Sequence, residues 1–484
     1  MKQKSLFKNA IYKAILSFVN LLVPVLVGSY IVKLLDVELY GAYNKVVSEF
    51  QVFLTFASFG IYTFGIREIS KIRDNPEKIS ILFTNLLVLS VITNFITTGI
   101  YIIYSIFTSS GITTVLYMLM IIQFVANMFY IEFVNEALEN YKFITVKSVL
   151  VKIIYMISLF LFVKKAEDII IYTIIVSLTA FLNNILSFIY AKKRIKFNFQ
   201  KISIKKYVIP LLTILVISNI ELLFSQLDRI MLGKFVSDVS VTMYYIPYYL
   251  IAMLTSIPYA IINVSVPRLS YILENNGKDE YISSLNKSIS SLLFVVIPMC
   301  FGVIVLAEEA ILLYAGEKYM AMVPTLIIAC LARIGISIES LMTNLVTYPN
   351  NKENQLLKFS LIFGLSNLIM NSLLVFFGVF NPSTALMTTA LAELGLALSQ
   401  YFYAKKKLGL NFKILTKQNV TYFIISICFI PVSYIIRLAD LSFMLNLIVI
   451  VIVCIMLYGI VLLIMKDENL LFTINKFIKK LKRN

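Results

Sequence analysis

Charged side chains inside long apolar stretches are the residues of this sequence that could do chemistry. Arg333, Glu221 and Glu393 each stand near the middle of such a stretch, and Lys152 stands about two helical turns into another. Asp228 and Arg229 follow one another toward the end of the stretch that contains Glu221. Ionisable groups in apolar surroundings are costly, and they usually line a water-filled cavity or pair with one another.

Arg333 is the most informative of these residues, because a guanidinium is always charged and its parallel N–H groups match two phosphate oxygens at once. In a cavity it could hold a pyrophosphate, with Arg229 and Lys152 as further cations. A buried ion pair that fixes helix packing is the other interpretation, and the sequence leaves both open. The candidate partners for such a pair are Glu221, Glu393 and Glu339.

The carboxylates Glu221, Glu393 and Asp228 are candidates for proton or ion coupling. The chain has no histidine, so any proton transfer near neutral pH must depend on carboxylates. Local pairing at a helix end is the alternative for Asp228, and helix packing is the alternative for the other two. We expect Glu49 and Glu132, which stand near the ends of stretches, to lie at an interface.

The rest of the sequence offers no catalytic chemistry. Without histidine, His-based catalysis and most zinc sites are excluded, and no Gly-rich phosphate loop or metal-ligand cluster is present. We therefore predict no catalytic residue, no metal and no cofactor. The amides in apolar stretches are expected to form hydrogen bonds between helices rather than a sugar site. These amides are Asn20, Gln123, Asn127, Asn183 and Asn184.

The elements that must position these side chains are membrane-spanning helices. Apolar residues make up 60% of the 484-residue chain and charged residues 14%, whereas soluble domains have about 45–50% and about 25%. A span of a bilayer core needs about 20 apolar residues in a helix. We find fourteen such stretches, which predict an all-α polytopic membrane protein with fourteen transmembrane helices. They are 11–35, 46–66, 79–107, 112–135, 144–163, 168–191, 208–234, 241–266, 288–314, 322–347, 356–380, 383–404, 418–437 and 443–465.

The net charge of +17 predicts topology rather than a nucleic-acid partner. Most of the 43 lysines and arginines fall at the N-terminus, at every second connection and at the C-terminus. Lys142 and Lys147 are counted in that set. By the positive-inside rule this side is cytoplasmic, and both termini lie there. The outward connections are short, the longest near residues 36–45, which leaves no extramembrane region for an enzyme.

Two segments recur six spans apart, which indicates a parallel internal repeat. Residues 190–199 read YAKKRIKFNF and residues 403–412 read YAKKKLGLNF, while 69–75 (ISKIRDN) resembles 269–275 (LSYILEN). The prediction is an N-terminal six-helix lobe over 1–200 and a second over 201–415. Two further helices and a basic tail would occupy 416–484. This arrangement favours a transporter with a site between the lobes over a channel or a receptor.

Short motifs along residues 10–410, in order and spacing, carry a resemblance to a known family. They are LDRIMLG at 227–233, GAY at 41–43, GI-x-x-FGIREI at 60–69, YAGEKY at 314–319, PNNKE at 349–353, Asn367 with Asn371, and Ala392 with Glu393. The sequence resembles the Wzx-type polysaccharide-unit flippases of bacteria, within the multidrug/oligosaccharidyl-lipid/polysaccharide exporter superfamily. The resemblance implies a V-shaped bundle of two lobes around a central cavity that alternates its access.

The function implied by the resemblance is translocation of undecaprenyl-pyrophosphate-linked oligosaccharide units from the inner to the outer leaflet of the bacterial cytoplasmic membrane. The product would be capsule, O-antigen or exopolysaccharide. The implied partners are the lipid-linked oligosaccharide, membrane lipids and a polysaccharide polymerase, with no nucleic acid. The alternatives are a multidrug extruder or a lipid II flippase of the same superfamily. A membrane-embedded glycosyltransferase is the alternative from a different class of protein.

Overall fold

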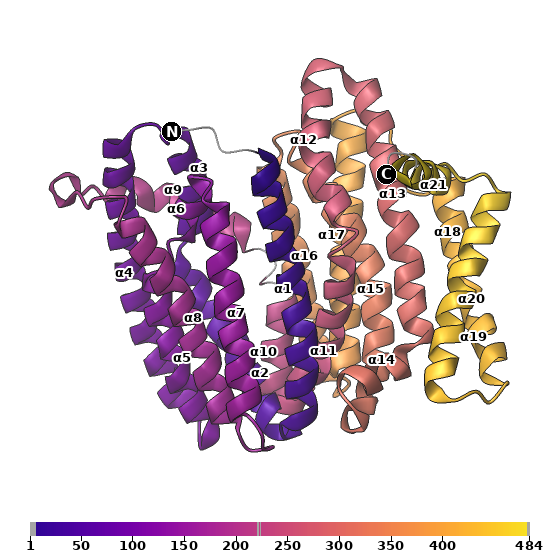
Figure 1. The fold of residues 1–484 in the computed structure, drawn as a ribbon, viewed down its shortest axis with the longest axis horizontal. Helices are drawn as coiled ribbons and strands as arrows, with labels where there is room; N and C mark the ends of the chain where they lie inside the picture. Colours follow the sequence, from indigo (N-terminus) through magenta and orange to yellow (C-terminus); the bar gives the residue numbers. More distant parts are fainter. Residues whose placement is uncertain (1–5, 220–221, 223, 482–484) are drawn as a thin grey trace. The chain divides into compact units, whose positions relative to one another are not determined.

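The computed structural model describes residues 6–219, 222 and 224–481, and within these residues all regular structure is helical (Figure 1). Contacts between residues divide the chain into two compact units, Met1–Thr242 and Met243–Asn484. The two lobes and the C-terminal segment expected from the repeat stay a prediction.

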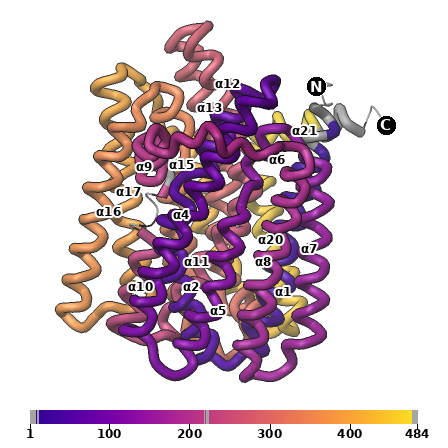
Figure 2. The backbone as a smooth tube through the Cα atoms, turned by 90° about the vertical axis from the view of Figure 1, so that its left-hand side faces the viewer, coloured from indigo at the N-terminus to yellow at the C-terminus, as the bar shows by residue number. Residues whose placement is uncertain are grey.

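The N-terminal unit is built from ten helices and the start of an eleventh. They are α1 (Leu6–Leu34), α2 (Val37–Ser58), α3 (Ile61–Lys71), α4 (Pro76–Thr108), α5 (Ile112–Met128), α6 (Glu132–Ala137), α7 (Tyr141–Phe162), α8 (Ile169–Lys192), α9 (Lys205–Ser218), α10 (Ser225–Phe235) and α11 (Asp238–Thr255), with a 3₁₀ turn at Phe199–Lys201. Helices α2, α4 and α5 pack against one another, α8 packs on α5 and α7, and α1 packs on α7 (Figure 2).

The C-terminal unit begins within α11 and adds ten α-helices. They are α12 (Ala260–Asn275), α13 (Lys278–Val305), α14 (Ala307–Tyr314), α15 (Val323–Leu341), α16 (Glu353–Phe376), α17 (Pro382–Lys407), α18 (Lys417–Ile427), α19 (Phe429–Arg437), α20 (Phe443–Ile464) and α21 (Glu468–Leu481). A 3₁₀ turn, η3 (Glu317–Met322), precedes α15, and a π-helical turn, η4 (Met342–Thr347), follows it. Helix α15 packs closely against α17 and α13.

The prediction of an all-helical membrane protein is confirmed, and the number of spans stays a prediction. Among the described residues, eleven helices or helix runs are long and apolar enough to cross a membrane, and the bent pair α11 and α12 adds a twelfth. The stretch 383–404 forms α17, which is not among those spans. The stretch 208–234 forms the shorter helices α9 and α10, separated by residues that are only partly described.

One expectation about local structure was wrong. Residues 37–45, expected in an outward connection, form the start of α2, because the Asp36 carboxylate accepts hydrogen bonds from the amides of Glu38 and Leu39 and caps that helix. The stretch 241–266, expected as one span, forms the pair α11 and α12, which is bent by 55°. Pro258 lies in this break, where its missing N–H and its ring disfavour a continuous helix.

The break between α2 and α3 is also encoded locally. Phe59 and Gly60 have φ values of 49° and 69°, and only glycine takes up this left-handed backbone without a steric cost. Gly60 also lies close to the backbone of Leu211 in α9. Helix α2 therefore stops at Ser58, and the stretch 46–66, expected as one span, is shared between α2 and α3.

Candidate functional site

Arg333 lies on α15 among neutral groups in the C-terminal unit. Its side chain is largely buried, with 9% of the residue exposed. The Nε–H donates to the Thr255 Oγ1 at 2.6 Å, and the guanidinium lies over the Tyr259 ring, 4.7 Å from the centroid. The Tyr259 hydroxyl is in turn 3.1 Å from the Ser337 hydroxyl, one turn along α15 from Arg333. Ring and hydroxyl contacts hold the cation in place but leave its charge uncompensated.

No carboxylate among the described residues comes within ion-pair distance of Arg333. The expected alternative, a buried ion pair, therefore does not form with Glu339 or Glu393, and Glu221 lies outside the described residues. Glu339 instead accepts hydrogen bonds from Thr343 at 2.5 Å and from Gln400 at 3.2 Å. The terminal nitrogens of Arg333 make no hydrogen bond within the described chain.

The polar contacts of Glu339 coincide with an irregular turn. Helix α15 continues into the π-helical turn η4, where the hydroxyls of Thr343 and Thr347 contact the Gln400 amide oxygen at 3.2 and 2.6 Å. A π-turn leaves part of the backbone ladder rearranged and is frequent at functional sites. Side-chain hydrogen bonds to Gln400 thus hold the segment that follows Arg333 against α17.

The other predicted site residues are placed on separate helices. Lys152 is half-buried on α7, with no ion pair or hydrogen bond to the described residues. Asp228 is fully buried on α10, and the adjacent Arg229 donates from Nε to the Ser225 carbonyl at 3.3 Å. Both Asp228 and Arg229 take part in at least one further interaction, as does Glu393, which is half-buried on α17. In the C-terminal unit, α15 and α17, the helices of Arg333 and Glu393, pack together.

The N-terminal unit contains a buried ion pair that sequence reasoning missed. Lys147 Nζ lies 3.0 Å from Glu132 Oε2 and donates to the Ser187 hydroxyl at 2.6 Å, and that hydroxyl donates to the same carboxylate oxygen. The side chains of Lys147 and Glu132 are only 3% and 11% exposed. Lys147, counted among the cytoplasmic set, and Glu132, expected at an interface, are thus both buried within the protein. This ion pair joins α6, α7 and α8.

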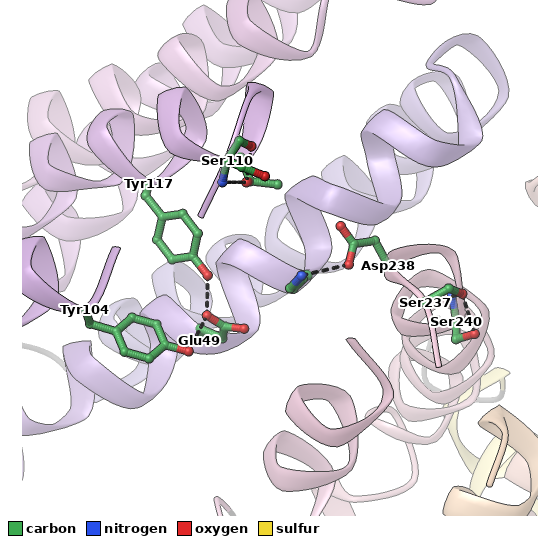
Figure 3. A network of polar contacts seen from close by, with 9 residues as sticks. Glu49, Tyr104, Ser110, Tyr117, Ser237, Asp238 and Ser240 are labelled. Carbon is green, nitrogen blue, oxygen red and sulfur yellow. Dashed lines mark hydrogen bonds and ion pairs between the residues drawn. The ribbon is translucent and has the colours of Figure 1, made fainter. Parts of the chain in front are cut away.

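A second buried carboxylate in the same unit is held by tyrosines. Glu49 on α2 is 6% exposed, and its Oε2 accepts hydrogen bonds from the hydroxyls of Tyr104, at 2.8 Å, and Tyr117 (Figure 3). Glu49, expected at an interface, is thus covered by α4 and α5. The spacing of Tyr101 and Tyr104, three residues apart on one helical face, was the available signal for a polar site there.

Gln123, Asn127 and Asn184 form the expected hydrogen bonds between helices, whereas Asn183 donates to Asn184 on its own helix. Gln123 donates to the Ser177 hydroxyl at 3.2 Å, Asn127 to the Asn94 amide oxygen at 3.0 Å, and Asn184 to the Ala126 carbonyl at 3.0 Å. These bonds tie α5 to α8 and to α4, which are the helices around Glu49 and Glu132.

Comparison with solved structures places this fold among flippases and multidrug transporters. The lipid II flippase MurJ, in an inward closed conformation, matches with a TM-score of 0.72 over 95% of this chain and 99% of its own, at 18% identity. The Vibrio cholerae MATE transporter VcmN matches with a TM-score of 0.51 over 86% and 98%, at 15% identity. The eukaryotic MATE transporter AtDTX14 matches with a TM-score of 0.54 over 87% and 99%, at 11% identity.

At identities this low, the structural matches establish the fold alone, and this fold is that of a MurJ-like multi-pass membrane protein. No curated protein matches this chain. The sequence pattern of the polysaccharide biosynthesis proteins matches residues 6–273, which is more than half of the chain. The resemblance drawn from the short motifs is thereby confirmed, and the protein belongs to the polysaccharide biosynthesis protein family.

Proposed function

We propose that this protein flips undecaprenyl-pyrophosphate-linked oligosaccharide units from the inner to the outer leaflet of a bacterial cytoplasmic membrane, by alternating access. The observation that supports this most directly is Arg333, a buried guanidinium with neutral neighbours and unused N–H donors. A pyrophosphate supplies the negative charge that the surrounding side chains do not. The family of polysaccharide biosynthesis proteins and the MurJ-like fold support a lipid-linked saccharide as the carrier of that charge.

The roles of the other residues follow from their charge. Arg229 and Lys152 are proposed as secondary contacts for the pyrophosphate or for the cavity it crosses. Asp228, Glu221 and Glu393 are proposed as sites where an ion or proton gradient acts on transport. Both termini are proposed to face the cytoplasm, and a polysaccharide polymerase is proposed as a partner.

The test is made in the bacterium that carries the gene. Deletion is expected to remove a surface polysaccharide and to cause accumulation of its lipid-linked units, and the native gene restores export. Arg333→Ala is expected to reach the membrane at native levels without restoring export. Each charge-assisted hydrogen bond is worth about 1.5–3 kcal/mol, so loss of one weakens head-group binding about 10- to 100-fold. Arg333→Lys keeps the charge but loses the fork, so we expect partial export.

A matched control is Arg437→Gln, because Arg437 is paired with Glu309 at 2.7 Å and is already compensated. Full export by Arg333→Ala would remove Arg333 from the mechanism. Unchanged polysaccharide together with altered drug sensitivity would favour the multidrug extruder instead.

A lipid II flippase is the second candidate, favoured by the TM-score of 0.72 to MurJ. Lipid II also carries a pyrophosphate, so Arg333 would serve both substrates. Depletion of the protein separates them: loss of a dispensable polysaccharide supports the first proposal, whereas lysis with accumulated lipid II supports the second.

A further inference from the structure

The two segments that recur in the sequence, 190–199 and 403–412, have no role in the proposed function, and each opens a basic connection between helices. We name residues 192–206 the N-strap and residues 405–417 the C-strap. The N-strap runs from the end of α8 into the first turn of α9, and the C-strap runs from the last turn of α17 to the start of α18. Neither strap contains an aspartate or a glutamate. Each unit therefore has one connection whose charged residues are all basic.

The N-strap is held against α4 by an asparagine and an aromatic ring. The Asn85 side chain donates to the Lys201 carbonyl at 3.1 Å and accepts from the Ser203 amide at 2.6 Å. The ring of Phe197 stacks on that of Phe83, with 5.7 Å between the centroids. These contacts fix the backbone of the strap, so its outward side chains project from an ordered segment.

The C-strap is held in a similar way in the C-terminal unit. The Asn286 side-chain oxygen on α13 accepts a hydrogen bond from the Lys413 amide at 3.0 Å. The buried ring of Phe412 lies 5.2 Å from that of Tyr401 on α17. In both straps, an asparagine of a neighbouring helix and one aromatic ring thus hold the backbone in place. The recurring sequence motif therefore corresponds to a recurring local structure.

The positive charges of the straps are almost all unmatched. Every basic side chain of the two straps is exposed. They are Lys192, Lys193, Arg194, Lys196, Lys201, Lys205 and Lys206 in the N-strap, and Lys405, Lys406, Lys407, Lys413 and Lys417 in the C-strap. Within the described chain, only Lys201 is in an ion pair, with Glu77 at 2.9 Å. The straps are therefore surfaces that suit an anionic partner.

Exposed apolar side chains lie among these charges. Phe199 and Ile202 of the N-strap are 58% and 44% exposed, and Leu415 of the C-strap is 83% exposed. Each strap adjoins a helix run that is apolar enough to cross a membrane: the N-strap follows Ile169–Lys192, and the C-strap leads into Lys417–Arg437. The straps therefore lie where spans leave the hydrocarbon core, at the level of the lipid head groups.

The combination of unmatched lysines and exposed apolar side chains identifies the partner. A free phosphate ion or a nucleic acid would match the charges alone. A bilayer leaflet with anionic head groups matches both features, because its head groups lie directly above an apolar layer. A soluble protein would have to displace the lipid that already surrounds the adjoining spans. The leaflet is therefore the partner that both straps fit.

We propose that the N-strap and the C-strap are binding sites for anionic phospholipids. The basic side chains contact the head groups, and Phe199, Ile202 and Leu415 insert beneath them. Each lysine or arginine near an anionic leaflet strengthens binding about fivefold, so several on one ordered segment select anionic over zwitterionic lipid. This binding needs no lipid-linked oligosaccharide, so the inference goes beyond the proposed function and does not depend on it.

The test uses a single tryptophan as reporter, because the chain contains none. Phe199→Trp and Leu415→Trp are made separately, and each full-length protein is reconstituted into nanodiscs of phosphatidylcholine and phosphatidylglycerol in equal parts. Bromine on the acyl chains of one lipid or the other quenches an indole that touches that lipid. We expect phosphatidylglycerol to quench both reporters more strongly, by at least about twofold. Phe95→Trp, at an exposed position within the α4 span, is the control and should be quenched equally by both lipids.

Removal of charge tests whether the basic side chains cause this preference. Lys192→Gln together with Lys193→Gln, in the Phe199→Trp protein, is expected to weaken binding of phosphatidylglycerol up to about 25-fold and to abolish most of the preference. The matched control is Lys164→Gln with Lys165→Gln, which removes the same net charge from exposed positions at the opposite end of α8. The control should keep the preference. Because all four side chains are exposed, both variants are expected to fold.

Each strap is decided by its own reporter. Equal quenching by the two lipids would overturn the proposal for that strap. Quenching by neither lipid would show that the strap lies in water and would favour a soluble anionic partner instead. A preference that survives the loss of Lys192 and Lys193 would exclude their charges as its cause. Because the nanodiscs contain no lipid-linked oligosaccharide, this proposal and the proposed function can fail separately.

Discussion

Both contact units of this protein hold buried acids with partners from the protein, and they differ in a buried base. In Met1–Thr242, the buried acid Glu132 is neutralised by Lys147, and the buried acid Glu49 is solvated by tyrosine hydroxyls. In Met243–Asn484, the buried base Arg333 has only a hydroxyl and an aromatic ring beside it. A charge matched within the protein holds helices together, whereas an unmatched one is available to a ligand of opposite charge. The C-terminal unit thus contains a buried positive charge that an anion can match.

The largest expected effect on stability comes from breaking the matched pair. Lys147→Met leaves Glu132 buried without a partner, which should cost about 3–5 kcal/mol of folding free energy. Thermal unfolding of the purified protein in detergent measures the loss. Lys142→Met, at an exposed position on the same helix, is the control. The double variant Lys147→Met with Glu132→Gln should recover most of the stability. A single-variant loss below about 1 kcal/mol would show that the pair is not structural.

The next largest expected effect is the loss of stability when either of two glycines at helix contacts, one in each unit, is replaced by alanine. A Cβ at Gly65 would lie 2.3 Å from the ring of Phe133, and a Cβ at Gly395 would lie 2.3 Å from the ring of Phe363. Phe133 is fully buried, so Gly65→Ala should cost about 1–3 kcal/mol. Phe363 is only half-buried and can rotate away, so Gly395→Ala should cost less in the same unfolding measurement. Equal losses would contradict this ranking of the two contacts.

Replacing Arg333 should abolish export but change the free energy of unfolding only slightly, which tests whether its charge is matched within the protein. Arg333→Met removes one hydrogen bond and one cation–π contact, but it also removes an unmatched buried charge. We expect unfolding to change by less than about 1 kcal/mol, while export is lost. A loss as large as that of Lys147→Met would instead show that Arg333 is matched by a group of the protein.

The smallest expected effect is on the pH dependence of stability, and it comes from Asp168, an acid outside the spans. Hydrogen bonds from the backbone amides of Lys164 and Lys165 to Asp168 lower the pKa of this carboxyl, which precedes α8. A lowered folded-state pKa adds stability above the ordinary pKa of about 3.9, and this stability is lost as the pH falls through the folded-state pKa. Asp168→Asn should therefore be slightly less stable at neutral pH, with the difference vanishing in acid. Glu167→Gln, the exposed neighbour, should show no such trend.

The accuracy of the sequence predictions followed the range of the interactions. Helix existence was predicted well, because the apolar stretches act locally: a run of about 20 apolar residues has few alternatives to a membrane helix. Helix ends that depend on a capping side chain or on an unusual backbone conformation were predicted less well. Asp36 extended α2 into an expected loop, the left-handed Gly60 separates α2 from α3, and Pro258 lies in the bend between α11 and α12.

The candidate site shows the same division. The sequence placed Arg333 inside the membrane and identified it as a possible anion ligand, but it could not choose between an ion pair and free N–H groups. Glu49, Glu132 and Lys147 were taken for interfacial or topological residues because they stand near the ends of apolar stretches. Their partners are 15 to 68 residues away along the chain, as with Lys147 and Glu132 or Tyr117 and Glu49. Pairing at such separations depends on how the helices pack and rotate.

By itself, the sequence determined that this is an all-helical membrane protein without histidine chemistry, with the motifs of a polysaccharide biosynthesis family. Hydrophobicity, residue type and short-range spacing are properties of the chain, so they can be read without coordinates. Only the tertiary structure decided which buried charges are matched. Whether a side chain meets an opposite charge, a hydroxyl or neither depends on helix rotation of a fraction of a turn, which apolar periodicity in a lipid-facing helix does not fix.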